Sequence, residues 1–198
     1  MEPRLTEKKR KAIVDAASEL FLDKGYGSVS MDNIASYAKV SKRTVYNHFS
    51  SKEDLFSEVV TCIWSEHSVP QLKYHDGADI RQDLIDFAEQ SMDLLYSDKF
   101  NKLIRFVMGE SGRFPVITRI YSEKGIRSLL ITLADYLADA GKGKIDDPFL
   151  ASQYYLGMVK ESLFWPVLLG LIPMPSPEKQ KEIINKTAGI FTNIYDLK

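Results

Sequence analysis

Residues 30–56 read SMDNIASYAKVSKRTVYNHFSSKEDLF, and this stretch decides the fold. Apolar residues recur at helical spacing in two short runs. They are Ile34, Ala35 and Ala38 in the first run, and Val45 and Phe49 in the second. Ser30 and Ser41 stand just before the two runs, where serine commonly caps a helix. The pattern predicts two short helices joined by a tight turn at residues 38–41, followed by the start of a third.

The second of these helices carries more hydrogen-bonding side chains than solubility requires. With its two apolar residues inward, its outer surface presents Lys42, Arg43, Thr44, Tyr46, Asn47 and His48. Arginine pairs well with guanine, and asparagine with adenine, in the DNA major groove. We therefore predict a helix-turn-helix that enters the major groove. A three-helix module for packing or protein contact is the alternative, but it does not account for this polar density.

Two helix starts in this stretch favour nearby anions. Free amides remain at the helix start that Ser30 caps, and such an end favours a backbone phosphate. Ser50 and Glu53 fit a capping box for the third helix. Lys52 then lies in a first helical turn, where a cation is unfavourable unless an anionic group lies close by.

Length and composition limit what the rest of the chain can be. The chain has 198 residues, of which 44% are hydrophobic and 27% charged, enough for a small module and one larger globular domain. No apolar run reaches the roughly 18 residues of a membrane span. Residues 1–11 are too charged for a signal peptide. We expect a cytoplasmic protein without membrane partners, and the single Cys62 excludes an internal disulfide framework.

Charge is unevenly distributed along the chain. Residues 1–53 carry a net charge of +3 and the remainder carries −4. A basic end on an acidic body suits a protein that presents one end to phosphates. The charged N-terminal segment, residues 2–11, can reach phosphates or a minor groove, although a solvated surface explains it equally well. Its basic residues are Arg4, Lys8, Lys9, Arg10 and Lys11.

Together these residues resemble the N-terminal DNA-binding domain of the TetR family of transcriptional regulators, over about residues 7–56. The specific parts are Ile34-Ala35, Val40-Ser41, Thr44-Val45-Tyr46, His48-Phe49 and the run from Ser51 to Phe56. The resemblance implies an all-helical homodimer. Each subunit would offer one recognition helix to half of a pseudo-palindromic operator in double-stranded DNA, and a larger C-terminal domain would bind a small molecule.

The resemblance also assigns roles to single residues. It places Thr44, Tyr46, His48 and Lys52 at positions that usually hold phosphates, and Lys42, Arg43 and Asn47 where base edges are read. Ser30 and Lys39 complete the predicted DNA-binding set. This sequence departs from the family at Lys39, where the turn commonly has glycine, and at Arg43, where a small residue is frequent. A positive φ at Lys39 would cost on the order of 1 kcal/mol.

The rest of the chain also follows helical spacing, so we predict an all-α fold of about nine helices. The expected helices span about 6–24, 30–38, 41–49, 50–69, 80–97, 98–111, 115–140, 147–168 and 176–198. Gly125 is a weak point of the seventh, and Pro166 should bend the eighth. The domains expected are residues 1–56 for DNA binding, and residues 57–198 for effector binding and dimerisation.

Residues 104–125, IRFVMGESGRFPVITRIYSEKG, resemble the AefR-like subgroup of TetR-type C-terminal domains. An acid and an arginine-phenylalanine-proline run occur there at this spacing. Glycine after one helix and proline at the start of the next also fit a simple helix-helix corner. The resemblance covers only about residues 103–125 and supports the domain rather than any ligand.

The expected effector is a small hydrophobic or aromatic molecule. Candidate residues for its site are Trp64, Phe87, Phe106, Glu110, Tyr121 and Trp165, with Arg105 and His67 as further polar groups. Aromatic residues at helical spacing more often belong to a core than to a ligand site. The two last predicted helices are unusually apolar. We expect them to form the homodimer interface, although packing on their own core is the alternative.

We therefore predict a ligand-responsive regulator, a repressor that its effector releases from a palindromic operator. A constitutive or partner-regulated repressor without an inducer is the alternative, and an activator role stays open. The sequence lacks the common motifs of hydrolases, phosphate-binding loops and zinc proteases, so we expect no enzyme. A helical catalyst with a cryptic site is the remaining rival. His67 and His75 have no companion at ligand spacing, so neither a metal nor a cofactor is expected.

Overall fold

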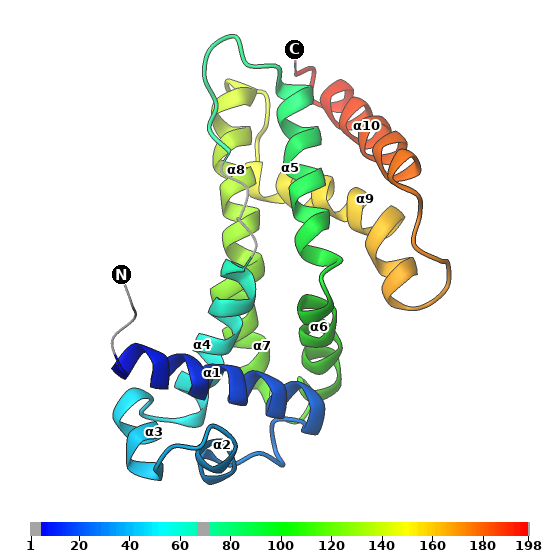
Figure 1. Cartoon of the computed structure of the whole chain (residues 1–198). Coiled ribbons are helices and arrows are strands. Elements are labelled where there is room, and N and C mark those ends of the chain that lie inside the picture. Colours follow the sequence, from blue (N-terminus) through cyan, green and yellow to red (C-terminus); the bar gives the residue numbers. More distant parts are fainter. Residues whose placement is uncertain (1–4, 67–71, 198) are drawn as a thin grey trace. The chain divides into compact units, whose positions relative to one another are not determined.

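The computed structural model describes residues 5–66 and 72–197, and in this part the chain is helical throughout its regular structure (Figure 1). The α-helices are α1 Leu5–Lys24, α2 Met31–Tyr37, α3 Lys42–His48, α4 Lys52–Ser65, α5 Ile80–Leu95, α6 Asp98–Glu110, α7 Pro115–Tyr121, α8 Arg127–Gly141, α9 Pro148–Leu168 and α10 Pro177–Ile194. A π-helical turn, Ser122–Ile126, joins α7 to α8 without a break. These three segments form the single helix expected over residues 115–140, and the all-α prediction is confirmed.

The chain divides into two compact units by its internal packing. The first unit comprises Met1–Glu66 and Lys102–Gly125, and the second comprises His67–Asn101 and Ile126–Lys198. Helix α4 runs without interruption across the boundary expected between residues 56 and 57. The division into a DNA-binding domain ending at residue 56 and an effector domain after it stays a prediction.

The first unit is organised around α1, which packs against α2, α3 and α4. The inward positions expected from its spacing are buried: Ile13, Ala17, Leu20 and Phe21 are each at most 5% exposed. Val45 of α3 and Phe56 of α4 are fully buried in the same core. Each such side chain contributes roughly 1.5–3 kcal/mol when it leaves water. This core holds the two short helices that could not be stable alone.

Side-chain caps fix where the short helices begin. Ser30 caps α2 in a reciprocal pair with Asn33, and Ser41 caps α3 by accepting from the Thr44 amide. The capping box expected at Ser50 and Glu53 is wrong by one residue. Ser51 accepts from the Asp54 amide at 3.0 Å, and the Asp54 carboxylate accepts from the Ser50 amide at 3.0 Å. Two consecutive serines each precede an acid by three residues, so the pattern alone could not choose between them.

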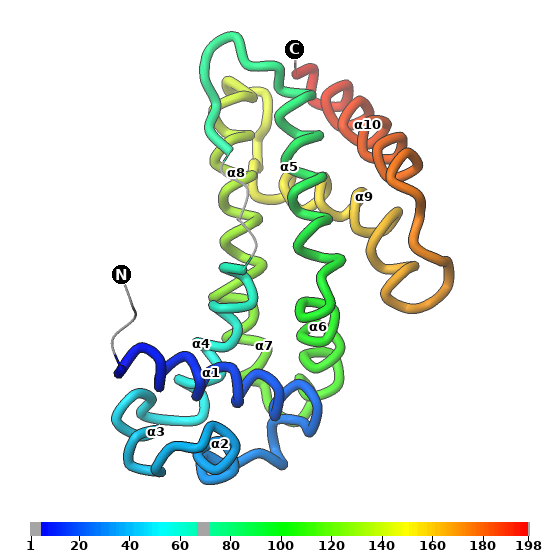
Figure 2. Tube along the Cα trace, viewed as in Figure 1, coloured from blue at the N-terminus to red at the C-terminus, as the bar shows by residue number. Residues whose placement is uncertain are grey.

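The second unit is built on α9, which packs against α5, α8 and α10 (Figure 2). Tyrosine hydroxyls tie its helices together from within the core. Tyr155 of α9 donates to the Leu84 carbonyl at 2.6 Å, and Tyr136 of α8 donates to the Asp83 carboxylate at 2.6 Å. Buried polar groups with partners of this kind help to specify one packing arrangement.

The π-helical turn lies where the sequence predicts a weak point, at Gly125. A Cβ atom at Gly125 would overlap the indole ring of Trp64 on α4. Trp64 is 4% exposed, and its ring centroid lies 6.3 Å from that of Tyr121 on α7. Glycine is therefore required here because the Trp64 ring occupies the space of a side chain.

Among residues 5–66 and 72–197, no helix has the length and the apolar character that crossing a membrane would need.

Candidate nucleic-acid interface

The turn between α2 and α3 is a Schellman motif with lysine in the position that usually holds glycine. The Lys39 amide donates to the Ser36 carbonyl at 3.2 Å, and the Val40 amide donates to the Ala35 carbonyl at 3.0 Å. Lys39 has φ of 54°, in the left-handed region, as its position in the turn implies. Its conformation costs about 1–2 kcal/mol relative to glycine. The Lys39 side chain is exposed beside the start of α3.

Helix α3 presents one polar face and buries the other. Val45 is fully buried, and Phe49, the C-cap residue, is 2% exposed. Arg43, Tyr46 and Asn47 lie on the opposite side, because residues three and four apart share a face of a helix. All three are exposed, and no hydrogen bond or ion pair within the described residues occupies them. We call these three residues the recognition face.

The other predicted residues of α3 flank this face and are partly occupied. Lys42 donates to the Asp32 carboxylate on α2 at 2.9 Å, and this contact raises the pKa of Lys42. The Thr44 hydroxyl lies 2.8 Å from that of Ser41. His48 is half-buried, with its ring 6.4 Å from the ring of Phe49. The six side chains expected on the outer surface therefore fall into two groups. The recognition face has no hydrogen bond or ion pair within the described residues, whereas Lys42, Thr44 and His48 contact other side chains of the first unit.

Removing the Asp32 charge should strengthen DNA binding. In Asp32→Asn, Lys42 loses its internal partner, and a negative charge is removed from the surface next to the recognition face. We expect a severalfold gain in DNA affinity at low salt, shrinking as salt screens the charges. Stability should change by less than about 1 kcal/mol, because exposed ion pairs contribute little. Fluorescence anisotropy at two salt concentrations measures this, and Lys42→Met, which should bind more weakly, is the control. An unchanged affinity for Asp32→Asn would contradict the assignment of Lys42 to the interface.

Lys52 is turned toward the protein. Its ammonium donates to the carbonyls of Tyr26 at 2.9 Å and Val29 at 3.0 Å, and lies 4.2 Å from the centroid of the Tyr26 ring. Desolvation lowers its pKa. The carbonyls and the ring supply the negative potential that a cation at a helix start requires. Its role in holding a phosphate, implied by the family resemblance, stays a prediction.

Two basic residues of the N-terminal segment also form ion pairs within the protein. Arg10 pairs with Glu58 of α4 at 2.6 Å, and Lys11 pairs with Asp15 at 2.7 Å. The hydrogen bond to Glu58 raises the pKa of Arg10. Lys8 and Lys9 are exposed on the first turns of α1, and Arg4 lies outside the described residues.

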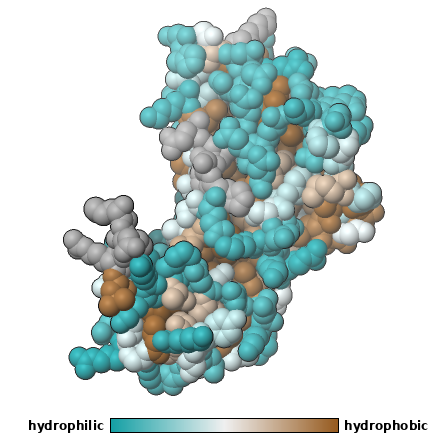
Figure 3. Space-filling model, viewed as in Figure 1, coloured by the Kyte–Doolittle hydropathy of each residue, from teal (hydrophilic) through white to brown (hydrophobic). Residues whose placement is uncertain are grey.

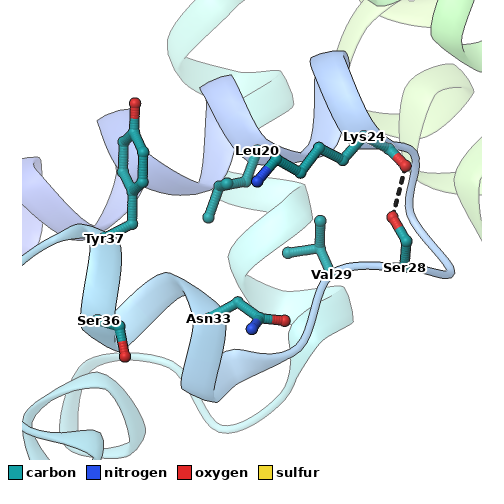
Figure 4. A pocket seen from close by; sticks show the side chains of 7 residues that line it. All are labelled: Leu20, Lys24, Ser28, Val29, Asn33, Ser36 and Tyr37. Atoms are coloured by element: carbon teal, nitrogen blue, oxygen red, sulfur yellow. Dashed lines mark hydrogen bonds between the residues drawn. The ribbon is translucent and has the colours of Figure 1, made fainter.

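A hollow of about 450 Å³ opens between α1 and α2 (Figure 4). It is lined by Leu20, Lys24, Ser28, Val29, Asn33, Ser36 and Tyr37. Tyr37 donates to the Glu19 carboxylate at 2.6 Å, which fixes its ring at one end of the hollow. Lys24, Ser36 and Tyr37 were not identified from the sequence. Ser36 and Tyr37 directly precede the predicted turn, whereas Lys24 is the last residue of α1.

The residues expected to bind an effector are divided between the two units. In the first unit, Trp64 and Tyr121 are neighbours, and burial raises the pKa of Tyr121. Phe106 packs on Phe56 at 5.5 Å between ring centroids. The Glu110 carboxylate lies against Gly25, at the end of α1.

The remaining effector candidates belong to the second unit. Phe87 is 1% exposed in its core, and Trp165 is half-buried with its ring centroid 5.1 Å from that of Phe164. His67, named as a polar candidate, lies outside the described residues. These six side chains stay predictions as ligand contacts.

Comparison with protein families gives two matches along the chain. Residues 13–59 match the family described as bacterial regulatory proteins, tetR family. Residues 82–197, more than half of the chain, match the C-terminal domain described as that of an AefR-like transcriptional repressor. The first match contains α2, the turn and α3.

Solved structures agree over nearly the whole chain. The Flavonoid-responsive Regulator FrrA is 32% identical, with a TM-score of 0.82 over 95% of this chain and 97% of that chain. A TetR family transcriptional regulator from Pseudomonas syringae pv. tomato str. DC3000 is also 32% identical, with a TM-score of 0.75 over 96% of this chain and 97% of that one.

Matches to curated proteins are shorter. The regulator YhgD of Bacillus subtilis (strain 168) is 35% identical over 35% of this chain and 40% of its own length. The activator FasR of Mycolicibacterium smegmatis is 46% identical over 27% of this chain and 25% of its own length. The chain thus spans less than half the length of these relatives. From the two family matches and the full-length structural similarity, the chain belongs to the TetR family of transcriptional regulators, with an AefR-like C-terminal domain.

Proposed function

We propose that this protein is a homodimeric repressor that binds a palindromic operator and leaves it when a small hydrophobic or aromatic effector binds the C-terminal domain. The recognition face carries the proposal. Arg43, Tyr46 and Asn47 are exposed and unoccupied on a helix that a Schellman turn and a serine cap fix at its start. A rigid helix with free polar groups is what reading of base edges requires.

The DNA-binding residues divide into two roles in this proposal. Arg43, Asn47 and Lys42 read base edges, because Arg and Asn form bidentate pairs with guanine and adenine. Tyr46, Thr44 and His48 contact phosphates at the sides of the groove. Ser30 and Lys39 approach the backbone from the turn side. Lys24 and Ser36 border the hollow beside α2 and extend this polar surface.

The dimer forms through α9 and α10 in this proposal. Large apolar side chains are exposed on both helices and on the segment between them, where apolar surface is visible at the edge of the molecule (Figure 3). They are Phe149, Leu150, Tyr154, Leu169, Leu171, Ile172, Met174, Ile190 and Ile194. At Gly157 a Cβ would meet no atom within 4 Å, which leaves room for a helix of a second copy. Such a surface supports pairing of two copies.

Effector binding would act by changing the spacing of the two recognition helices. Dimeric readers of this kind need a spacing of about 34 Å, one turn of DNA. A preference of a few kcal/mol for the DNA-incompatible state is enough to release the operator. The name of FrrA describes a flavonoid-responsive regulator, which supports an aromatic effector class. Trp64, Phe87, Phe106, Glu110, Tyr121 and Trp165 remain the candidate contacts.

The sign of regulation differs among the relatives. IcaR of Staphylococcus aureus, 38% identical over 25% of this chain and 27% of its own length, is named a negative regulator, and FasR is named an activator. Repression follows most simply from occupying a promoter, and we propose it here.

Substitutions on the recognition face test the proposed function. Arg43→Ala should reduce discrimination at one base pair in each half-site by about 1–3 kcal/mol while leaving binding to unrelated DNA nearly unchanged. Tyr46→Phe should weaken binding to all DNA alike, because a phosphate contact carries no sequence information. Competition with single-base operator variants measures both effects. Identical behaviour of the two variants would contradict the division of roles.

A further inference from the structure

We propose that Lys52 is a positioning residue for DNA binding. Its ammonium holds the α1–α2 loop, residues 25–29, from inside the first unit, and thereby fixes α2 and α3 relative to α4. The inference rests on the proposed function as a DNA-binding regulator. It gives Lys52 a different role from the phosphate contact that the family resemblance implies.

The contacts of Lys52 all lead to this loop. Two of its three N–H groups donate to the carbonyls of Tyr26 and Val29, near the two ends of the loop. The Tyr26 carbonyl also accepts from the Val29 amide at 3.4 Å, so the turn closes around the ammonium. The ring of Tyr26 covers the same cation at 4.2 Å. A phosphate would compete with these partners for the ammonium.

Aromatic packing anchors the loop to the core through Tyr26. Tyr26 is 4% exposed, and its ring centroid lies 5.4 Å from that of Phe21, 5.7 Å from that of Phe56 and 5.3 Å from that of Phe114. Burial raises the pKa of Tyr26 to about 12, so its phenol is neutral at physiological pH. The cation therefore faces a neutral, buried ring and two carbonyls.

The corner between α6 and α7 holds the loop from another side. The ring of Phe114 lies so close to Gly27 that a Cβ there would be 2.8 Å from its Cζ atom. Arg113 covers that ring at 5.6 Å. The loop is thus set between Lys52 of α4 and Phe114 of the corner, and a change at either contact should displace it.

The loop leads directly into α2, which packs on the recognition helix α3. Val29, 2% exposed, precedes Ser30, the cap of α2, and α2 packs on α3. A displaced loop therefore carries the recognition face away from its position relative to α4, without removing any group that touches DNA.

The first experiment uses the whole protein without DNA. In Lys52→Met, amide NMR signals of Val29, Ser30 and Asn33 should shift, and their hydrogen exchange should accelerate. The exposed Lys39 provides the control: Lys39→Asn also removes a lysine charge while its backbone tolerates a positive φ. It should leave those three amides unchanged. Signals of the three amides that match the wild type in Lys52→Met would overturn the inference.

The second experiment separates positioning from phosphate contact on a DNA duplex carrying the operator selected from random sequence. Lys52→Met should lower operator affinity about tenfold, with the salt dependence of binding unchanged. A lost phosphate contact instead reduces the slope of log K against log salt by about 0.9. Gly27→Ala crowds the loop against the Phe114 ring without altering charge, so we expect it also to lower affinity at an unchanged slope. A slope reduced in Lys52→Met by the amount of one phosphate overturns the inference, as does wild-type affinity in both variants.

The proposed function and this inference fail in different ways. If selection yields no binding sequence for the wild type, the proposed function fails, and the measurements without DNA decide whether Lys52 fixes the loop. If selection succeeds but the slope of log K against log salt is reduced in Lys52→Met by the amount of one phosphate contact, only the inference fails. Should Lys52→Met not fold, Gly27→Ala decides the outcome: affinity equal to that of the wild type overturns the inference.

Discussion

Ile190→Glu should dissociate the dimer and reduce operator affinity at least 100-fold. Ile190 lies on α10 with 53% of its surface exposed, within the apolar surface that we propose joins two copies. A two-fold interface contains each substitution twice, so two carboxylates would be buried at once. Burying an unpaired charge costs several kcal/mol, and each 1.4 kcal/mol is a factor of ten. Sedimentation at micromolar concentration and operator titration measure the two effects.

The matched control is Ile131→Glu on α8. Ile131 is 40% exposed and lies outside the proposed interface, so it should leave the dimer and DNA binding unchanged. If both variants remain dimeric, α10 is not the interface. A wild-type protein that is only monomeric at the same concentration would remove the dimer from the account.

Gly125→Ala and Gly109→Ala should differ in stability by about 3 kcal/mol, although both replace a helical glycine by alanine. Alanine normally stabilises a helix by roughly 0.5–1 kcal/mol relative to glycine. A Cβ at Gly109 meets no atom within 4 Å, so this gain should appear there. At Gly125 the same atom overlaps the buried Trp64 ring, and overpacking of this kind costs typically 1–3 kcal/mol.

Denaturant unfolding of both variants measures the difference, and a second substitution identifies its cause. Trp64→Phe shortens the ring that meets Gly125, so adding it to Gly125→Ala should recover part of the loss. Such recovery is the coupling expected of residues in contact. Equal stabilities for Gly125→Ala and Gly109→Ala would mean that the ring moves aside without cost.

The sequence was most informative where spacing and capping agree. The apolar positions of α1, the caps Ser30 and Ser41 and the inward Val45 were all predicted, because each depends on residues within one helical turn. Gly125 was identified as a weak point for the same reason. Its contact with Trp64 joins distant parts of the chain, and the sequence held no sign of it.

Other features depend on choices that local patterns leave open. Ser50 and Ser51 both precede an acid by three residues, and only the fold shows that Ser51 caps α4. The phosphate role of Lys52 comes from the family resemblance and stays a prediction, whereas its carbonyl partners lie more than twenty residues away, beyond the reach of a local pattern. Lys39 was noted as unusual, and its φ of 54° follows from the turn rather than from its own preference.

The effector contacts are the feature that the sequence determines least, and they stay a prediction. Aromatic residues at helical spacing serve a core as well as a ligand site, so the pattern could not separate the two. Trp64, Phe106 and Tyr121 lie in one compact unit, whereas Phe87 and Trp165 lie in the other. Phe87 is as buried as a core residue. Its burial results from long-range packing, which local spacing does not encode.

Selection of binding sites from random-sequence DNA tests the central claim most directly, when combined with sedimentation of the resulting complex. We predict an inverted repeat whose half-sites are one helical turn apart, about 34 Å, or a multiple of this spacing. Two chains should bind each repeat. A protein that enriches no sequence, or that binds an asymmetric site as one chain, would contradict the assignment of the recognition face, Arg43, Tyr46 and Asn47, as one of two paired DNA-binding surfaces.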